Sequence, residues 1–362
     1  MTFQELLADK IFDLPLIQKK AGSFKEFIEK FLNDFLKKVE TLEDNRIQLD
    51  TFSIDIEFIK TTQRKIVRGL IESIKNYYDG YPQKAYQKID MVLRNDLKDL
   101  YAIIKQKTYE ENESFYRIRL SEKNFTFDKS ELFHIPFQLR NKVSTQRYSI
   151  PGFPSLYLGR TIYICWEELN RPSIDKIQVV RLKNKKSINC LDLTPPQNDC
   201  KNLDELYKFF MTFPLIACCS VKVFDSSDTF KPEYIIPQLL LQWVRNNDIL
   251  DGIRYKSTHI NSEIYKENSE LINIVMPVKK TKNSGLCEEL LSTFESTEVI
   301  SWNIYQFAIG GQLFLYNDKD AEIVNKKIPR LELIKGRKYP YFYSNLGRLE
   351  HYLEFMETKE IV

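Results

Sequence analysis

The sequence predicts an α+β protein in which an all-helical part precedes a domain built around a mixed sheet. Up to about residue 110, apolar residues recur at the three- and four-residue spacing of a buried helical stripe. After that point, short segments rich in β-branched and aromatic residues alternate with helical stretches. We therefore expect a helical N-terminal domain over residues 1–110 and a mixed domain over residues 111–362.

Three helices are expected in the first domain. Ser23 and Glu26 have the spacing of a capping box, in which each side chain binds a free backbone amide at the start of a helix. Gly80 and Pro82 separate the second helix from the third, because glycine can close one helix and proline can open the next. The three apolar stripes run over residues 24–39, 59–78 and 85–104.

The second domain is expected to contain short strands, two clear helices and a C-terminal β extension. The helices are predicted at 203–210 and 236–245, the second with Pro237 in its first turn. The extension is predicted as strands over 300–309 and 312–316, joined by two glycines that permit a tight hairpin. The other strands are predicted at 115–120, 156–158, 177–182, 215–223, 253–255 and 272–278.

Composition excludes several classes of function. The 53 Lys and Arg residues nearly balance 50 Asp and Glu residues, so no overall field favours nucleic acid. The 6 cysteines form no C-x-x-C pair and the 3 histidines are dispersed, so no metal site is expected. No apolar run approaches the roughly 20 residues that span a bilayer. Without a secretory segment or a disulfide-like cysteine pattern, a cytoplasmic protein is expected.

Five residues have the chemistry to bind and cleave a dinucleotide. Arg117 and Arg147 can hold a diphosphate through paired hydrogen bonds. Tyr157 can stack on a base, and Ser257 can bind a ribose or an amide. Glu168 can stabilise the positive charge that builds on a ribose when its bond to nicotinamide breaks. The set is therefore suited to NAD.

Each of these residues also has a structural explanation. An arginine at a strand end commonly forms a surface ion pair, and a tyrosine between leucines commonly lies in the core. A serine closing a strand is commonly a turn residue, and paired glutamates commonly form the solvated side of a helix. Glu167 is an alternative to Glu168 as the functional carboxylate. His134, which has apolar neighbours, is best explained as a hydrogen-bonded, semi-buried side chain.

These segments resemble the RES domain family, and the resemblance covers about residues 115–278. The sequence departs from the family at Gln146 and at Tyr148-Ser149, where glycine and Trp-Asn are usual. The matching segments are Tyr116-Arg117, Arg147, Leu156-Tyr157, Cys165 to Glu168, Gly252 to Ser257, and Asn273 within an apolar strand.

The resemblance implies an ADP-ribosyltransferase-like fold that binds NAD as substrate and removes nicotinamide, in a toxin–antitoxin or phage-defence setting. Catalysis would depend on Glu168, Arg117 and Ser257. NAD would be bound by Arg117, Arg147, Tyr157, Ser257 and Asn273. The N-terminal domain is similar to the HEPN-like extension of larger RES proteins, but it contains no histidine for ribonuclease chemistry. A regulatory or oligomerising role is expected for it.

Several alternatives stay open at this point. The enzyme could be an NAD glycohydrolase, an NAD phosphorylase or a protein ADP-ribosyltransferase, because the sequence does not name the acceptor. A non-enzymatic binding or scaffold protein with a RES-like fold is a further alternative. Partners other than NAD could be an antitoxin, another regulatory protein or a second copy of the chain.

Overall fold

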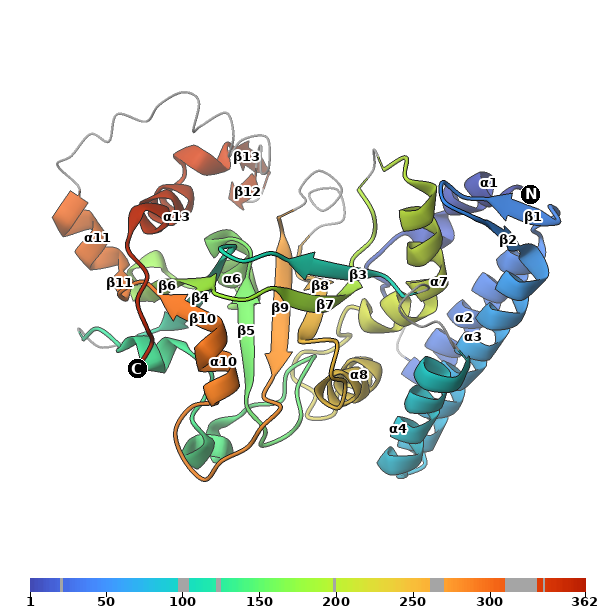
Figure 1. The fold of residues 1–362 in the computed structure, drawn as a ribbon, viewed down its shortest axis with the longest axis horizontal. Coiled ribbons are helices and arrows are strands. Elements are labelled where there is room, and N and C mark those ends of the chain that lie inside the picture. The colour runs from blue at the N-terminus through green and yellow to red at the C-terminus, as the bar shows by residue number, and fades with distance from the viewer. Residues whose placement is uncertain are drawn as a thin grey trace. The chain divides into compact units, whose positions relative to one another are not determined.

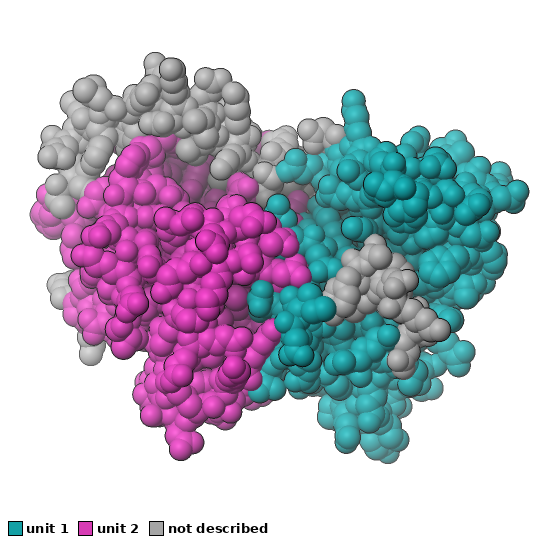
Figure 2. Space-filling model, viewed as in Figure 1, with its two compact units in different colours: residues 1–107, 145–150, 191–253 teal, residues 108–144, 151–190, 254–362 magenta. Residues whose placement is uncertain are grey.

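The computed structural model describes residues 1–19, 22–96, 104–121, 125–197, 200–260, 270–309, 331–334 and 336–362. The chain forms two compact units, which Figure 2 shows in different colours. Unit 1 comprises residues 1–107, 145–150 and 191–253, and unit 2 comprises residues 108–144, 151–190 and 254–362. The sequence predicted a single boundary after residue 110. Composition along the chain does not show that residues 145–150 and 191–253 belong to the same unit as the N-terminal residues.

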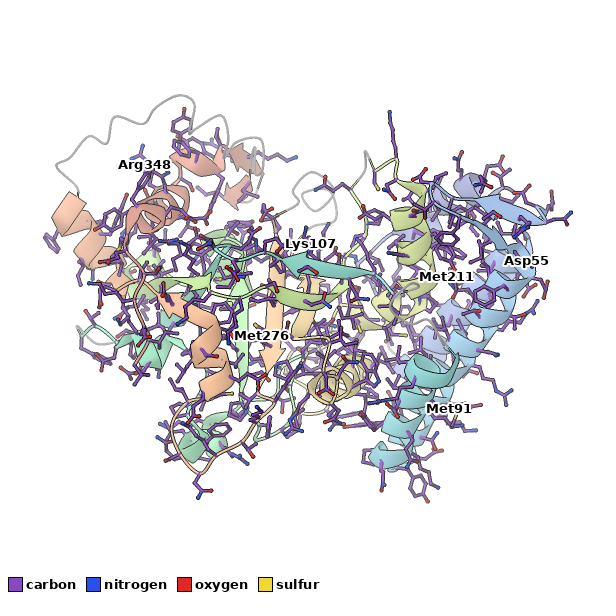
Figure 3. All side chains as sticks on the ribbon, viewed as in Figure 1. Asp55, Met91, Lys107, Met211, Met276 and Arg348 are labelled. Atoms are coloured by element: carbon purple, nitrogen blue, oxygen red, sulfur yellow. The ribbon has the colours of Figure 1, made fainter. Side chains whose placement is uncertain are left out.

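Unit 1 is mostly helical. Asp55 caps the long helix α3 by accepting hydrogen bonds from the backbone amides of Glu57 and Phe58 (Figure 3). Among the described residues, the Ser23 hydroxyl forms no such bond, so the predicted capping box is wrong. The helices are α1 (Phe3–Leu7), α2 (Phe24–Glu40), α3 (Ile56–Tyr78), α4 (Pro82–Met91), α7 (Leu203–Cys219) and α8 (Ile235–Arg245). A short hairpin joins β1 (Arg46–Gln48) to β2 (Ser53–Asp55).

The helices predicted at 24–39 and 59–78 are confirmed, and the third is shorter than expected. α4 ends at Met91, and a π-helical turn follows over Val92–Asp96. The rest of the predicted third helix reaches into residues 97–103, which lie outside the described residues. Pro82 occupies the first turn of α4 as predicted.

Helix α7 packs into the core of unit 1. Phe213 lies 4.4 Å from Phe12 and 5.2 Å from Phe35 between ring centroids, and the Gln63 amide donates to the Phe210 carbonyl. The predicted strand 215–223 is wrong, because α7 continues to Cys219. Its uninterrupted apolar run is buried on all sides, and such a run lacks the period that separates a helix from a strand.

Nine strands of the described chain form one sheet, in the order β10-β6-β4-β5-β9-β8-β7-β3, with β11 also paired to β6. β4 and β6 are antiparallel, and so are β5 and β9, which run side by side in Figure 1. The strands are β3 (Gln106–Tyr109), β4 (Ser114–Leu120), β5 (Ser155–Gly159), β6 (Ile177–Asn184), β7 (Ile188–Leu193), β8 (Gly252–Lys256), β9 (Ile272–Pro277), β10 (Phe294–Ser296) and β11 (Ile300–Ser301). An α+β fold is therefore confirmed, together with five of the predicted strands.

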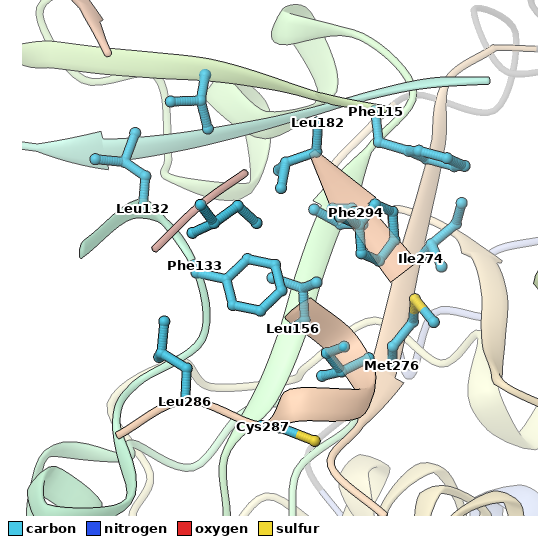
Figure 4. Close-up of a cluster of buried hydrophobic side chains, with 14 of the residues drawn as sticks. Phe115, Leu132, Phe133, Leu156, Leu182, Ile274, Met276, Leu286, Cys287 and Phe294 are labelled. Carbon is cyan, nitrogen blue, oxygen red and sulfur yellow. The ribbon is translucent and has the colours of Figure 1, made fainter. Parts of the chain in front are cut away.

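The central strands of unit 2 bury both faces. On one face, Phe115, Leu156 and Ile274 pack with Phe133 and Phe294 (Figure 4). The opposite face carries the alternate residues of the same strands and is covered by helix α6 (Ile162–Glu168). This alternation places the polar residues of β5 and β9 on the side of α6.

The C-terminal part of unit 2 is more helical than predicted. Residues 302–309 form helix α11 (Trp302–Ile309), so the predicted strand over 300–309 is wrong beyond Ser301. Trp302 and Tyr305 are one helical turn apart and both buried, which is the spacing of a helix rather than a strand. The predicted glycine turn and the strand at 312–316 lie outside the described residues. The remaining elements are α10 (Glu288–Thr293), β12 (Leu331–Ile334), β13 (Arg337–Tyr339) and α13 (Asn345–Phe355).

Candidate functional site

Three adjacent strands align the predicted site residues of unit 2. Tyr116 of β4 pairs with Gly159 of β5, and Gly159 pairs with Asn273 of β9. Arg117 follows Tyr116 directly, and Tyr157 precedes Gly159 by two residues on the same side of β5. The predicted residues therefore come from neighbouring strands near one row of the sheet, with Tyr157 and Asn273 on the α6 side and Arg117 leaving β4 on the opposite side.

Arg117 lies where β4 and β5 diverge. The two strands are paired at one position, Tyr116 with Gly159, and no further pair follows toward Arg117 in the described strands. The Arg117 guanidinium instead donates a hydrogen bond of 2.8 Å to the backbone carbonyl of Tyr157. Its side chain thus bridges the opening between the strands.

The positive charge of Arg117 is hydrogen-bonded to a neutral carbonyl and not to a carboxylate. Burial lowers the pKa of Arg117 to about 10, so the guanidinium stays positive at neutral pH. Across the part of the chain that the structure describes, no acidic side chain forms an ion pair with it. A half-buried cation of this kind is stabilised when an anion binds beside it.

Glu168 ends helix α6 and is held by Asn273. The side-chain amide of Asn273 donates a 2.7 Å hydrogen bond to Glu168 Oε1. Asn273 is 4% exposed, so its position is fixed by the packing around β9. The helix itself begins at Thr161, whose hydroxyl accepts from the amide of Ile164. The carboxylate of Glu168 is therefore oriented by a neutral donor from the neighbouring sheet.

Glu167 has a different environment from Glu168. Its carboxylate is bound by both Nε and a terminal nitrogen of Arg171, at 3.0 and 2.6 Å. The Arg171 guanidinium also lies over the Trp166 ring, 5.3 Å from its centroid. Glu167 is thus neutralised in a structural ion pair, which favours Glu168 as the functional carboxylate.

Gly159 and Cys165 bring α6 close to the sheet. A Cβ on Gly159 would lie 2.4 Å from Ile164 Cγ2 and 2.5 Å from Cys165 Sγ, so any larger residue would displace the helix. The Cys165 thiol donates to the Tyr116 carbonyl, and its pKa is raised to about 12 by burial, with opposing effects from Arg117 and Glu168. Cys165 is therefore a packing residue beside both charges and not a thiolate nucleophile.

Ser257 and Tyr157 also lie in unit 2. Ser257 follows β8 and is buried, and its hydroxyl accepts a 3.1 Å hydrogen bond from the His259 amide, as a turn residue does. Tyr157 is half-buried, and burial raises the pKa of its phenol, so the hydroxyl stays protonated. Both residues remain candidates for ligand contact, with Ser257 already committed to a local turn.

Arg147 belongs to unit 1 and is not part of the group that unit 2 brings together. Its guanidinium donates to the Cys219 carbonyl at 3.2 Å and lies over the Tyr234 ring, 5.2 Å from the centroid. These contacts hold the arginine against α7 and the residues before α8. Unit 2 therefore contains Arg117, Tyr157, Glu168, Ser257 and Asn273, and unit 1 contains Arg147.

Comparison with known proteins gives one extensive relative. A Bacillus subtilis (strain 168) protein named "Putative toxin YopC" is 32% identical over 364 residues, which cover 94% of this chain and 78% of that protein. This chain belongs to the YopC family. Because the alignment covers nearly the whole chain, family membership extends to both units. No protein-family model matches the chain, and no solved structure matches it.

His134 has the structural role that the sequence predicted. Its Nε2 accepts a 2.8 Å hydrogen bond from the Cys287 amide, and its Nδ1 lies 2.9 Å from the Ile135 carbonyl. The acceptor role of Nε2 assigns the ring proton to Nδ1. The side chain is 1% exposed, and burial lowers its pKa to about 4. The prediction of a hydrogen-bonded histidine is confirmed, and the side chain is more deeply buried than the semi-buried position that was predicted.

Sequence reasoning missed the polar residues that the C-terminal segment contributes. Glu350 and Tyr341 reach the first turn of α6, and neither belongs to a recognisable motif. The sequence signal that was overlooked is Glu350, a glutamate among the apolar residues Leu346, Leu349 and Leu353 of α13.

In the described part of the chain, no group of three or more His, Cys, Asp or Glu residues could hold a metal ion, and no helix could cross a membrane.

Proposed function

We propose that this protein is a toxin that binds NAD and breaks its nicotinamide–ribose bond. The observation that carries the proposal is that the positive charge of Arg117, bound to the Tyr157 carbonyl, and the carboxylate of Glu168, bound by Asn273, both act on Cys165 of α6. The relative named "Putative toxin YopC" supports the toxin part. The resemblance of residues 115–278 to the RES family supports NAD as the substrate and an ADP-ribosyltransferase-like fold.

Arg117 would hold a phosphate oxygen of the diphosphate. An arginine carries five N–H groups, and within the described residues one of those of Arg117 is directed at the Tyr157 carbonyl, which leaves others for an anion. Binding an anion there would neutralise a charge that the folded protein leaves against neutral groups. Arg147 and Tyr157 would complete the nucleotide contacts as further parts of the proposal.

Glu168 would act on the ribose. When the C–N bond to nicotinamide breaks, its electron pair leaves with nicotinamide and positive charge develops on the ribose. A carboxylate beside that ring stabilises the charge electrostatically. Asn273 would hold the carboxylate in place, and Ser257 would bind the ligand next to it. Water or phosphate would then attack the ribose carbon and release a proton, giving ADP-ribose or its phosphate ester.

Mass spectrometry of NAD incubated with the purified protein tests the proposal. We expect loss of NAD, one nicotinamide per NAD consumed, and ADP-ribose as the second product. Added phosphate that converts this product to the phosphate ester would identify a phosphorylase. Adenine-labelled NAD whose label becomes fixed on protein would identify a protein ADP-ribosyltransferase instead.

No consumption of NAD, with or without phosphate and a cell extract as acceptor, would contradict the enzymatic proposal and favour a binding or scaffold role. An active enzyme would also need restraint in its own cell, since NAD is required by every cell. An antitoxin or the helical unit 1 would supply that restraint, and a homo-oligomer is a further form of it. Growth of cells that express the protein with and without a co-expressed partner is the matching assay.

A further inference from the structure

The C-terminal segment of unit 2 binds the first turn of α6. Glu350 Oε2 accepts a 2.7 Å hydrogen bond from the Ile162 amide and a 2.6 Å hydrogen bond from the Tyr341 hydroxyl. The Tyr341 oxygen in turn accepts from the Tyr163 amide at 3.3 Å. Together with Thr161, these groups satisfy three of the backbone donors that every helix leaves free at its start.

Helix α13, which carries Glu350, is fixed to the sheet by contacts of its own. Arg181 of β6 donates to the carbonyls of Leu353 and Met356, at 2.8 and 2.6 Å. Glu354 accepts from the hydroxyl of Tyr116 on β4. The position of Glu350 is therefore set by β4, which also carries Arg117, and by β6, which pairs with it.

α6 depends on such contacts because it is only 7 residues long. A helix of two turns is unstable alone, so its position comes from tertiary packing and from its caps. Glu168 is its last residue, and Glu350 binds its first. A shift at the start of so short a helix moves its end as well.

We propose that Glu350 is a positioning residue that holds α6, and through it Glu168, against Asn273. It acts at the opposite end of the helix from the carboxylate that it places. For catalysis this inference rests on the proposed function, whereas the clamp itself is a property of the fold. The C-terminal helix is thus part of the machinery that orients the site.

The surroundings of Glu350 give the clamp a pH dependence. The pKa of Glu350 is raised to about 8, chiefly by burial and also by the charges of Glu354 and Glu270, against the hydrogen bonds from Tyr341 and Ile162 that lower it. Glu354 is paired with Arg181 and Glu270 with Arg160, and the other titratable groups facing the cluster are Tyr116 of β4 and Cys165 of α6. Because the folded-state pKa of Glu350 lies above the unfolded value near 4.5, this group stabilises the fold fully below about pH 4.5. That contribution is lost as pH rises from there to about 8.

Hydrogen–deuterium exchange of the peptide covering α6 tests the clamp directly. In Glu350→Ala, and in Tyr341→Phe if the first variant folds poorly, we expect the amides of Ile162 and Tyr163 to exchange about tenfold faster or more. Glu350→Gln keeps an acceptor oxygen and should exchange as the wild type does at neutral pH. Arg348→Gln is the matched control, because Arg348 is an exposed residue of the same helix, and the change leaves Glu350 and the contacts that anchor α13 in place.

Unchanged exchange at Ile162 and Tyr163 in both Glu350→Ala and Tyr341→Phe would overturn the clamp. Equal acceleration in Arg348→Gln would also overturn it, because the effect would then come from any change in α13 and not from Glu350. A pH profile adds a second readout: the wild type should lose stability relative to Glu350→Gln as pH rises from about 4.5 to about 8, with no further loss above that.

Kinetics test the positioning of Glu168. In Glu350→Ala we expect kcat for NAD cleavage to fall about tenfold or more while KM stays within about twofold, because Arg117 is untouched. Faster exchange with unchanged kcat would show that Glu168 does not depend on the clamp. A wild-type protein that cleaves no NAD would sink the proposed function, and the exchange experiment alone would then decide the clamp.

Discussion

Two cations, the buried Lys105 of unit 1 and the half-buried Arg117 of unit 2, have partners of opposite kinds. In unit 1, Lys105 lies 3.3 Å from both Asp192 and Glu205, and its side chain is 8% exposed. In unit 2, Arg117 donates to a backbone carbonyl, with no acidic partner among the described residues. Lys105 is therefore part of a closed structural network, whereas Arg117 retains a charge that a ligand can neutralise.

The same contrast separates two adjacent residues of α6. Glu167 is bound by Arg171, and Glu168 by the neutral amide of Asn273. A buried ionised side chain that is paired with an opposite charge has a structural role, because the two charges neutralise each other. A neutral partner leaves the charge able to interact with a substrate, and in this protein such charges gather around α6.

Replacing Lys105 gives the largest expected effect and tests the unit 1 side of the comparison. Lys105→Met would leave Asp192 buried without its cation, and breaking a buried pair from one side costs about 3–5 kcal/mol. Urea unfolding measures the loss. The control is Lys38→Met, which removes a surface pair with Asp9 and should cost less than about 1 kcal/mol. Equal losses would mean that burial does not distinguish the two pairs.

His134 tests how unit 2 tolerates a buried group that must stay neutral. The unfolded chain takes up a proton below about pH 6.5, whereas the folded protein resists it down to about 4. Stability is therefore fully present above pH 6.5 and falls as pH drops through that window, by on the order of 3 kcal/mol. His134→Gln should lack this component when unfolding is followed against pH. Parallel pH curves for the two proteins would contradict the buried neutral state.

Replacing Arg117 separates binding from stability. Arg117→Gln should weaken NAD binding about tenfold to a hundredfold, the effect of losing a charged hydrogen bond of about 1.5–3 kcal/mol. The free energy of unfolding should change little, since no ion pair is broken. Titration calorimetry with NAD measures the first and urea unfolding the second.

Arg119→Gln is the matched control for that experiment. Arg119 is two residues along the same strand, is 48% exposed and lies near Glu131 at 3.7 Å. The Arg119→Gln protein should bind NAD with the affinity of the wild type. Equal loss in both variants would show that a general positive field, and not Arg117 itself, attracts the ligand.

The sequence was informative where periodicity or local chemistry decides the structure. The stripes at 24–39 and 59–78, and the strands around Arg117, Tyr157 and Asn273, follow from local patterns. The continuation of α7 through Cys219 did not, because a fully apolar segment has no polar side to reveal its period. Helix α11 was missed because aromatic and β-branched residues favour strands locally, while packing of Trp302 and Tyr305 decided otherwise.

The candidate site was predictable in its members but not in its electrostatics. The order of residues indicated Arg117, Glu168 and Asn273, but no local pattern shows that Arg171 neutralises Glu167. That pairing depends on Arg171 adopting a backbone φ of 54°, just past the end of α6. The role of Glu350 depends on a contact across 188 residues of sequence, which only the fold reveals.

The rate of NAD loss in Glu168→Gln, compared with Glu167→Gln, tests the central claim most directly. Both changes remove one negative charge from the same turn of α6. We expect Glu168→Gln to lose about a hundredfold or more in rate with little change in unfolding free energy. Glu167→Gln should instead lose stability and keep its rate while folded. A Glu168→Gln protein that consumes NAD at the wild-type rate would contradict the account.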